Sequence, residues 1–164
     1  MATVTIPQIE NAFKQAAVAA INRAIVTARA AATRKVREVY AIKSSDLKKY
    51  VSIKRASYSK HEAIVDIRGR KIPIIHFGAK QTKRGVSVRI KKAEGRKVIP
   101  GAFIKKGQVW RRVGKARMPI KPLFTVAPAK MFELHAIKIF QEIAQQEFAK
   151  NFSREVDFRL GKII

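Results

Sequence analysis

The chain has 164 residues, 47% of them hydrophobic, and its 36 Lys and Arg against 11 Asp and Glu give a net charge of +25. This composition supplies enough apolar residues for a core and excludes a largely disordered chain. The absence of cysteine excludes disulfides and thiolate metal sites, and no apolar run approaches the ~18 residues of a transmembrane helix. The first ten residues, MATVTIPQIE, lack the basic start of a secretion signal, so we expect folding in a cytosol.

The positive charge is concentrated in the middle of the chain. Between Arg34 and Lys121 there are 27 basic and 5 acidic residues. Self-repulsion at this level opposes compactness, and a polyanionic partner, most commonly nucleic acid, is the usual reason for it. We predict a single domain over residues 1–164, made of a helical region at 1–50, a basic β-region at 51–121, and a C-terminal helix with a tail at 122–164.

Residues 7–40 carry the pattern of one long amphipathic helix. Ten of them are alanine, the strongest helix former, and Thr5 and Pro7 are suited to the helix start. An unbroken helix would be ~50 Å long, more than a small domain covers, so we expect that it breaks or packs partly on a neighbouring subunit. The predicted apolar stripe consists of Ile9, Phe13, Ala17, Ile21, Ile25, Ala28, Ala32, Val36 and Tyr40.

The basic middle has the alternating pattern of short strands separated by turn residues such as Gly85 and Gly107. The strand-like segments are VSIKRAS, EAIVDIR, KIPII, VSVRIKK, KVIPGAFIK and VWRRV. A short helix, DLKKY, precedes them, with candidate N-caps at Ser44, Ser45 and Asp46. We therefore predict the α+β class, with a central antiparallel sheet of short strands covered by the long N-terminal helix and a C-terminal helix.

The C-terminal region is predicted to begin with a helix, because Pro128 suits a first turn. The apolar face of this helix contains Phe132, Ala136, Ile139, Phe140, Ile143 and Phe148. In the tail SREVDFRLGKII, the alternation of Val156, Phe158 and Leu160 indicates a last strand.

The sequence contains no motif that predicts an enzyme. Its histidines, His61, His76 and His135, do not lie at metal-ligand spacing, and the HExxH, GxSxG and Walker patterns are absent. Glu62 and Asp66 share one face of a predicted strand, which is weak support for a metal nuclease, and pairing with nearby cations is the simpler interpretation. We expect no catalysis, no metal site and no cofactor.

A row of cations lies before, on and after the strand-like segment around Val86 and Val88. Solubility does not need so much charge of one sign, so we predict sequence-independent contacts with phosphates rather than a merely solvated face. The candidate nucleic-acid-binding residues are Lys80, Lys83, Arg84, Arg89, Lys91, Lys92, Arg96, Lys97, Arg111 and Arg112. Trp110 lies beside the last two, and the sequence leaves open whether it belongs to the core or stacks on a base.

Residues 71–104, KIPIIHFGAKQTKRGVSVRIKKAEGRKVIPGAFI, resemble the centre of the minor tail protein Z family of long-tailed bacteriophages. The resemblance is carried by three segments: Ile72 to Ala79, QTKRGVSV and GRKVIPGAFI. The order of the flanking parts agrees, with the Ala-rich helix and DLKKY before the centre and MPIKPLFTVAPAKMF after it. It covers about residue 10 to residue 150.

The resemblance implies a structural virion protein without enzyme activity, which completes the tail at its head-proximal end and aids head–tail joining and DNA passage. It implies assembly in the host cytoplasm, no membrane, and tail tube, tail terminator and head–tail connector proteins as partners. The long Ala-rich helix has more apolar stripe than one small sheet can bury, so we expect a homo-oligomeric ring. Genomic DNA, or an acidic partner in the neck, would face the basic residues. The alternative is a cellular sequence-independent nucleic-acid-binding protein of ribosomal or nucleoid type.

Overall fold

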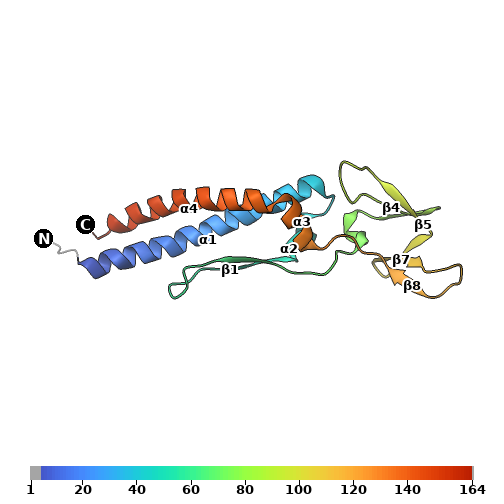
Figure 1. Cartoon of the computed structure of the whole chain (residues 1–164), viewed down its shortest axis with the longest axis horizontal. Helices are drawn as coiled ribbons and strands as arrows, with labels where there is room; N and C mark the ends of the chain where they lie inside the picture. The colour runs from blue at the N-terminus through green and yellow to red at the C-terminus, as the bar shows by residue number, and fades with distance from the viewer. Residues whose placement is uncertain (1–4, 164) are drawn as a thin grey trace. The chain divides into compact units, whose positions relative to one another are not determined.

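In the computed structural model, which describes residues 5–163, long helices and short antiparallel strands build an α+β fold, as predicted (Figure 1). The chain divides into two compact units. The helical unit contains the residues up to 32, residues 52–66, and those from 137 onward, and the basic unit contains residues 33–51 and 67–136. The first helix contributes residues to both units. The single domain expected for residues 1–164 stays a prediction.

Helix α1 spans Ile6–Val39 without a break. It starts directly after Thr5, whose N–H donates to the Gln8 side-chain oxygen at 2.9 Å, and Pro7 lies in the first turn, where its missing N–H costs nothing. The 34 residues give a helix about 50 Å long. Of the two expected outcomes for this helix, breakage is therefore wrong.

The buried face of α1 differs from the predicted stripe in its first half. Ile9 and Phe13 are 36% and 41% exposed, whereas alanines that recur every fourth residue are buried, together with Val18. Small side chains allow another helix to approach closely, so the packing partner, and not the bulk of the side chains, selects this face. The alanines are Ala12, Ala16, Ala20, Ala24, Ala28 and Ala32.

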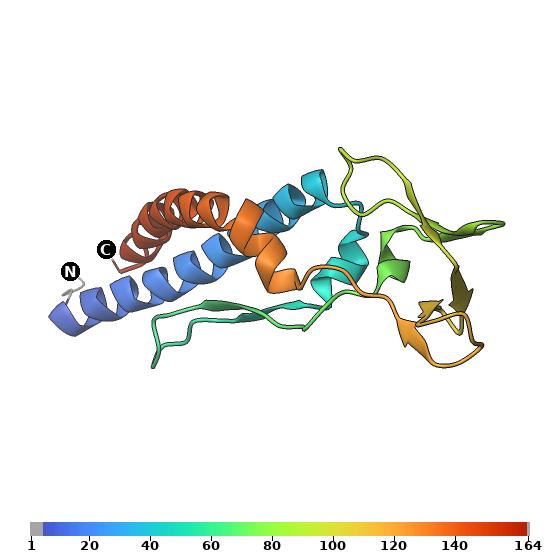
Figure 2. The same cartoon turned by 45° about the vertical axis from the view of Figure 1, so that its right-hand side comes forward.

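Helix α4, Ile137–Leu160, runs beside α1 in the helical unit, as both views show (Figures 1 and 2). Phe152 contacts Phe13 across the pair, with ring centroids 6.4 Å apart, and stacks on Phe148 at 5.5 Å. The prediction of a last strand in the tail is wrong, because the helix continues through it. Val156 and Leu160 extend the four-residue spacing of the two phenylalanines, so they also fit a helix face.

The helical unit also contains most of a two-stranded sheet, formed by β1, Val51–Lys54, and β2, Ile64–Ile67. The loop between these strands is tied to α1 by Asn22. The amide of Asn22 donates to the Ala56 carbonyl at 3.0 Å and accepts from the Ala56 N–H at 2.8 Å. This reciprocal pair satisfies loop backbone that would otherwise need water.

Three short helices pack in the basic unit: α2, Ser44–Lys48, the 3-10 helix η1, Ile74–Phe77, and α3, Pro128–His135. Pro128 occupies the first turn of α3, as predicted, but the single helix predicted through Phe148 is wrong, because α3 ends at His135 and α4 starts at Ile137. The N-cap of α2 is Lys43, without a side-chain cap, so the expected caps are wrong. The strand predicted for KIPII is wrong: Pro73 forms only an isolated bridge to Phe124, and the 3-10 helix η1 begins at Ile74. The largest fully buried side chains here are Tyr40, Phe77, Leu47, Ile72 and Met131.

The strands form three small antiparallel sheets in place of one central sheet. In the basic unit, one has the order β3-β4-β5 and the other β6-β7-β8. Gly101 follows β5 with φ 67, a left-handed conformation at which the chain leaves the first sheet for the second. The strands are β3 Lys80–Thr82, β4 Gly85–Val88, β5 Lys97–Pro100, β6 Ala102–Lys105, β7 Gln108–Arg112 and β8 Ile120–Pro122.

Candidate nucleic-acid interface

Most of the positive charge lies in one of the two units. The basic unit holds 25 of the 36 Lys and Arg and only 4 of the 11 acidic residues. All ten predicted binding residues belong to this unit. A surface with this imbalance produces a positive potential that attracts polyanions before any specific contact forms.

The turn between β3 and β4 presents two of the predicted residues, Lys83 and Arg84, to solvent. The turn is narrow because Thr82 pairs with Gly85, and the Thr82 hydroxyl donates to the Gly85 carbonyl at 2.9 Å. A Cβ at Gly85 would lie 2.1 Å from the Ile99 carbonyl oxygen, so only glycine fits here. The turn is therefore a rigid hairpin tip that carries two exposed cations.

Arg96 is fixed by the first sheet. Its guanidinium donates to the Ser87 hydroxyl at 3.1 Å, to the Ser87 carbonyl at 2.9 Å and to the Gly78 carbonyl at 2.7 Å. Lys80 pairs with Ser87 across the sheet and so lies on the same outward face. Arg96 therefore acts mainly as a link between β4 and η1, although its charge remains on this face.

Glu94 lies within the row of cations and engages two of them. Its carboxylate pairs with Lys97 at 2.6 Å and with Lys91 at 3.2 Å. Hydrogen bonds from Lys97 and Lys91 hold the pKa of Glu94 below its usual range. The carboxylate therefore stays ionised at neutral pH and competes with any external anion for these two lysines.

Strand β4 ends at Val88, so the predicted strand from residue 86 to 92 is too long. Arg89 lies beyond the strand end and donates to the Lys92 carbonyl at 2.6 Å. The chain leaves the sheet after Val88, and this hydrogen bond connects the two ends of the exposed segment 89–92. Within the part of the chain that the structure describes, the predicted cations whose side chains make no hydrogen bond, ion pair or ring contact are Lys80, Lys83, Arg84, Lys92 and Arg111.

The second sheet carries Arg111 and Arg112 on opposite faces of β7. Gln81 connects this sheet to the first, because its side-chain oxygen accepts from the Ile104 N–H at 2.9 Å while its amide donates to the Gly85 carbonyl at 3.1 Å. The structure therefore brings the two groups of predicted residues onto adjoining sheets, although 14 positions separate Lys97 from Arg111 in the sequence.

Further exposed cations on the second sheet were not predicted as binding residues. Lys106 occupies the tight turn between β6 and β7 at φ 50, followed by Gly107 at φ 70. Such paired left-handed residues match the twist of a two-residue hairpin. In the sequence, Lys105, Lys106 and Gly107 lie between two apolar runs, and this pattern indicates a hairpin turn that carries exposed cations. The additional exposed cations are Lys105, Lys106, Lys115, Arg117 and Lys121.

Acidic residues do not assemble into a metal site among residues 5–163, where no group of three or more His, Asp or Glu is placed to hold an ion. Glu62 pairs with Lys60 at 2.6 Å, which agrees with the simpler interpretation of this residue. In the same described range, no helix is long and apolar enough to cross a membrane.

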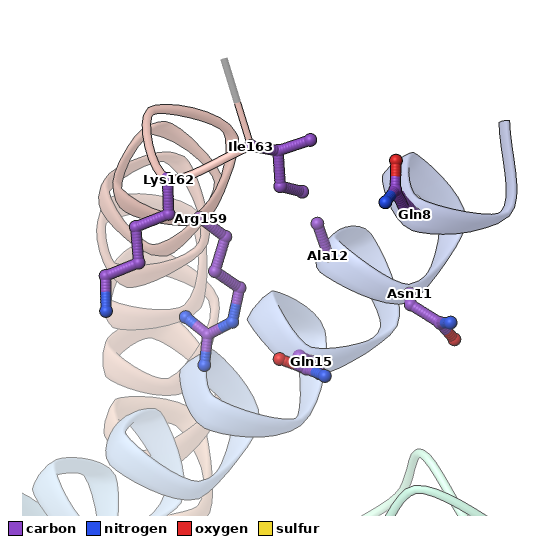
Figure 3. A pocket seen from close by; sticks show the side chains of 7 residues that line it. All are labelled: Gln8, Asn11, Ala12, Gln15, Arg159, Lys162 and Ile163. Carbon is purple, nitrogen blue, oxygen red and sulfur yellow. The ribbon is translucent and has the colours of Figure 1, made fainter. Parts of the chain in front are cut away.

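A pocket of about 280 Å³ lies where the start of α1 meets the end of α4 (Figure 3). Arg159 projects from α4 toward α1, near Gln15, and Ile163 lies close to Ala12. The lining contains amides, aliphatic groups and two cations but no carboxylate or imidazole, so it offers no acid–base pair. The lining residues are Gln8, Asn11, Ala12, Gln15, Arg159, Lys162 and Ile163.

Comparison with known protein families gives one match. Residues 5–164 match the sequence model of prophage minor tail protein Z, which covers nearly the whole chain. Comparison with curated proteins and with solved structures gave no match.

Proposed function

Because the chain belongs to the prophage minor tail protein Z family and so has a structural role in a phage tail, we propose that it is a tail completion protein at the head-proximal end. In this role it joins the tail to the filled head and lines the path of the genome. The proposed role is structural and requires no catalysis. Membership of this family favours the virion over the cellular nucleic-acid-binding alternative.

The observation that carries the proposal is the segregation of charge. The basic unit has 25 cations and 4 acids, whereas the helical unit has 11 cations and 7 acids. A general need for solubility would spread charge over both units. The basic unit therefore faces the polyanion, and the genomic DNA that passes from head to tail is the polyanion of a phage neck.

The contacts with DNA are proposed to be sequence-independent. Lys83 and Arg84 stand on the hairpin tip between β3 and β4, and not on a helix. Long cations on a small sheet neutralise phosphates without reading base edges. An acidic surface of a connector or terminator protein is the competing partner for the same residues.

The helical unit is proposed to contact neighbouring subunits or tail tube proteins in a homo-oligomeric ring. The α1 alanines are covered within the chain, but Ile6, Ile9 and Phe13 remain 74%, 36% and 41% exposed. Exposed apolar side chains that lie together at one helix end are typical of a surface that a partner protein covers. A tail structure with one copy of the protein, and with these residues bare, would contradict the ring.

The salt dependence of DNA binding tests the basic unit. For the parent protein, log affinity for a duplex is expected to fall linearly with log salt. Replacing Lys83 and Arg84 together by Ser should flatten the slope by about 1.8, since each lost phosphate contact contributes about 0.9. The matched control replaces Lys14 and Lys150, two exposed cations of the helical unit, by Ser.

Two unrelated duplexes should give the same affinity. A slope that does not change in the Lys83 and Arg84 variant, or that changes equally in the control, would refute phosphate contact by this turn. A strong preference for one duplex would instead favour a sequence-specific regulator.

A further inference from the structure

Three residues form a row across the second sheet of the basic unit. Phe103 on β6 lies directly opposite Trp110 on β7, and Trp110 lies directly opposite Pro122 on β8. Side chains opposite each other on neighbouring strands share a face, with Cβ atoms about 5 Å apart. The row therefore places two aromatic side chains and a proline on one face of the sheet. Strands β7 and β8 are labelled in Figure 1.

This row lies on the face of the sheet that points away from the core. Val109, next to Trp110, is 0% exposed, and Ala102, next to Phe103, is 3% exposed. Because successive side chains of a strand point to opposite faces, Phe103 and Trp110 point outward. Phe103, Trp110 and Pro122 all keep part of their surface accessible. Of the two interpretations of Trp110 that the sequence left open, the geometry disfavours the core.

Polar contacts hold the row in place. The indole N–H of Trp110 donates to the Lys105 carbonyl at 3.0 Å, which satisfies its only polar atom and limits rotation of the ring. The Arg112 guanidinium lies 5.8 Å from the centre of the Phe103 ring. The guanidinium of an arginine is planar and charged, so a base can also stack on it.

We infer that Phe103 and Trp110 of this row, together with the neighbouring Arg112, are a stacking platform for the unpaired bases of single-stranded DNA. This inference rests on the proposed function and deepens it, because it names the form of DNA that the second sheet binds. Every base has a flat π-face, so stacking tolerates any sequence, and the surrounding cations neutralise the phosphates. A duplex hides the base faces within its own stack. A glutamate or aspartate side chain of a protein partner has no such face.

Trp110 is the only tryptophan in the chain, so its fluorescence reports on the platform without any label. The unmodified protein is titrated with a 20-nucleotide thymidine strand, with an abasic 20-mer that has the same phosphates, and with a 20-base-pair duplex. Strong quenching by the thymidine strand alone is the expected result, with at least a fewfold tighter binding than to the abasic strand.

The outcomes separate the platform from the proposed function. Equal affinity and equal quenching for the thymidine and abasic strands would overturn the platform and leave the phosphate contacts standing. No binding of any of the three would overturn both. Poly-glutamate that binds as tightly as the thymidine strand at the same salt would overturn the platform in favour of an acidic protein partner.

Variants give a second measure that does not use tryptophan fluorescence. Trp110→Leu is expected to weaken binding of a dye-labelled thymidine strand by about 10-fold, and Trp110→Phe, which keeps a ring, by much less. Abasic-strand binding should not change. Tyr58→Leu removes an aromatic side chain that is 67% exposed in the helical unit, and it is the matched control. Equal losses for Leu and Phe at position 110, with folding intact by circular dichroism, would refute stacking.

Discussion

The Arg96 guanidinium donates to both the hydroxyl and the carbonyl oxygen of Ser87, at 3.1 and 2.9 Å. A third hydrogen bond, to the Gly78 carbonyl at 2.7 Å, connects the same side chain to the end of η1. Arg96 is thus a cation whose donors are largely used within the fold. The charge of the basic unit and the structure of its first sheet therefore depend partly on the same residue.

We expect Arg96→Lys to lower the free energy of unfolding by about 1–2 kcal/mol, although it keeps the charge, because an ammonium does not reproduce the planar, forked donors. Urea unfolding measures the change. Lys80→Ala is the control and should have almost no effect, since the Lys80 side chain is exposed and makes no hydrogen bond or ion pair within the described residues. A lysine variant as stable as the parent would show that only the charge matters.

Glu94→Gln is expected to strengthen DNA binding. The substitution releases Lys91 and Lys97 from the carboxylate and removes one negative charge from the row. The affinity for a duplex at low salt should rise roughly 2- to 10-fold, and the salt slope should become steeper. Fluorescence anisotropy with labelled DNA measures both.

The control for this change is Glu62→Gln, which makes the same change in charge beside Lys60 in the helical unit. An equal gain in the two variants would mean that only net charge matters. No gain at Glu94 would mean that Lys91 and Lys97 do not contact DNA.

Gly85→Ala is expected to destabilise the first sheet by about 3 kcal/mol or more. A Cβ there would lie 2.1 Å from the Ile99 carbonyl oxygen, and Gly85 has φ 147. Gly95 is the comparison, because it also has positive φ, 69, but nothing lies within 4 Å of an added Cβ. Gly95→Ala should cost only about 1 kcal/mol. Thermal unfolding of both variants decides this, and similar losses would mean that the close approach to Ile99 is relieved by a small shift.

Glu155 is expected to make the helical unit less stable in acid. A hydrogen bond from Arg159 lowers the pKa of Glu155 despite its burial, and Arg23 pairs with the same carboxylate at 2.5 Å. A lowered folded-state pKa means that the stabilisation is complete above the unfolded pKa of about 4.3 and is lost as pH falls through the folded value.

Glu155→Gln should therefore cost about 2 kcal/mol at pH 7, and the difference from the parent should shrink below about pH 4. Unfolding in urea at pH 7, 5 and 3 measures this. Glu142→Gln, an exposed position on the same helix, should show no such pH dependence. A difference between parent and Glu155 variant that stays constant down to pH 3 would contradict the assignment.

Several features of this protein follow from local sequence alone. Ten alanines among residues 7–40 and the Thr5–Pro7 start favour a helix, and α1 differs from the predicted extent by one residue at each end. The α+β class follows in the same way, since a period of two and a period of 3.6 are local properties of the chain. The family resemblance also depended on sequence strings, and the match over residues 5–164 confirms it.

Tertiary structure decided which faces are buried and which cations are engaged. Bulk suggested that Phe13 faces inward, but the alanines are buried there instead, and Phe13 keeps 41% of its surface exposed although it contacts Phe152 of α4. No local pattern indicates that Arg96 reaches Ser87, because the two residues meet only after β4 pairs with β5. The outward position of Trp110 likewise depends on cross-strand register, which sequence does not specify where strands are only three to five residues long.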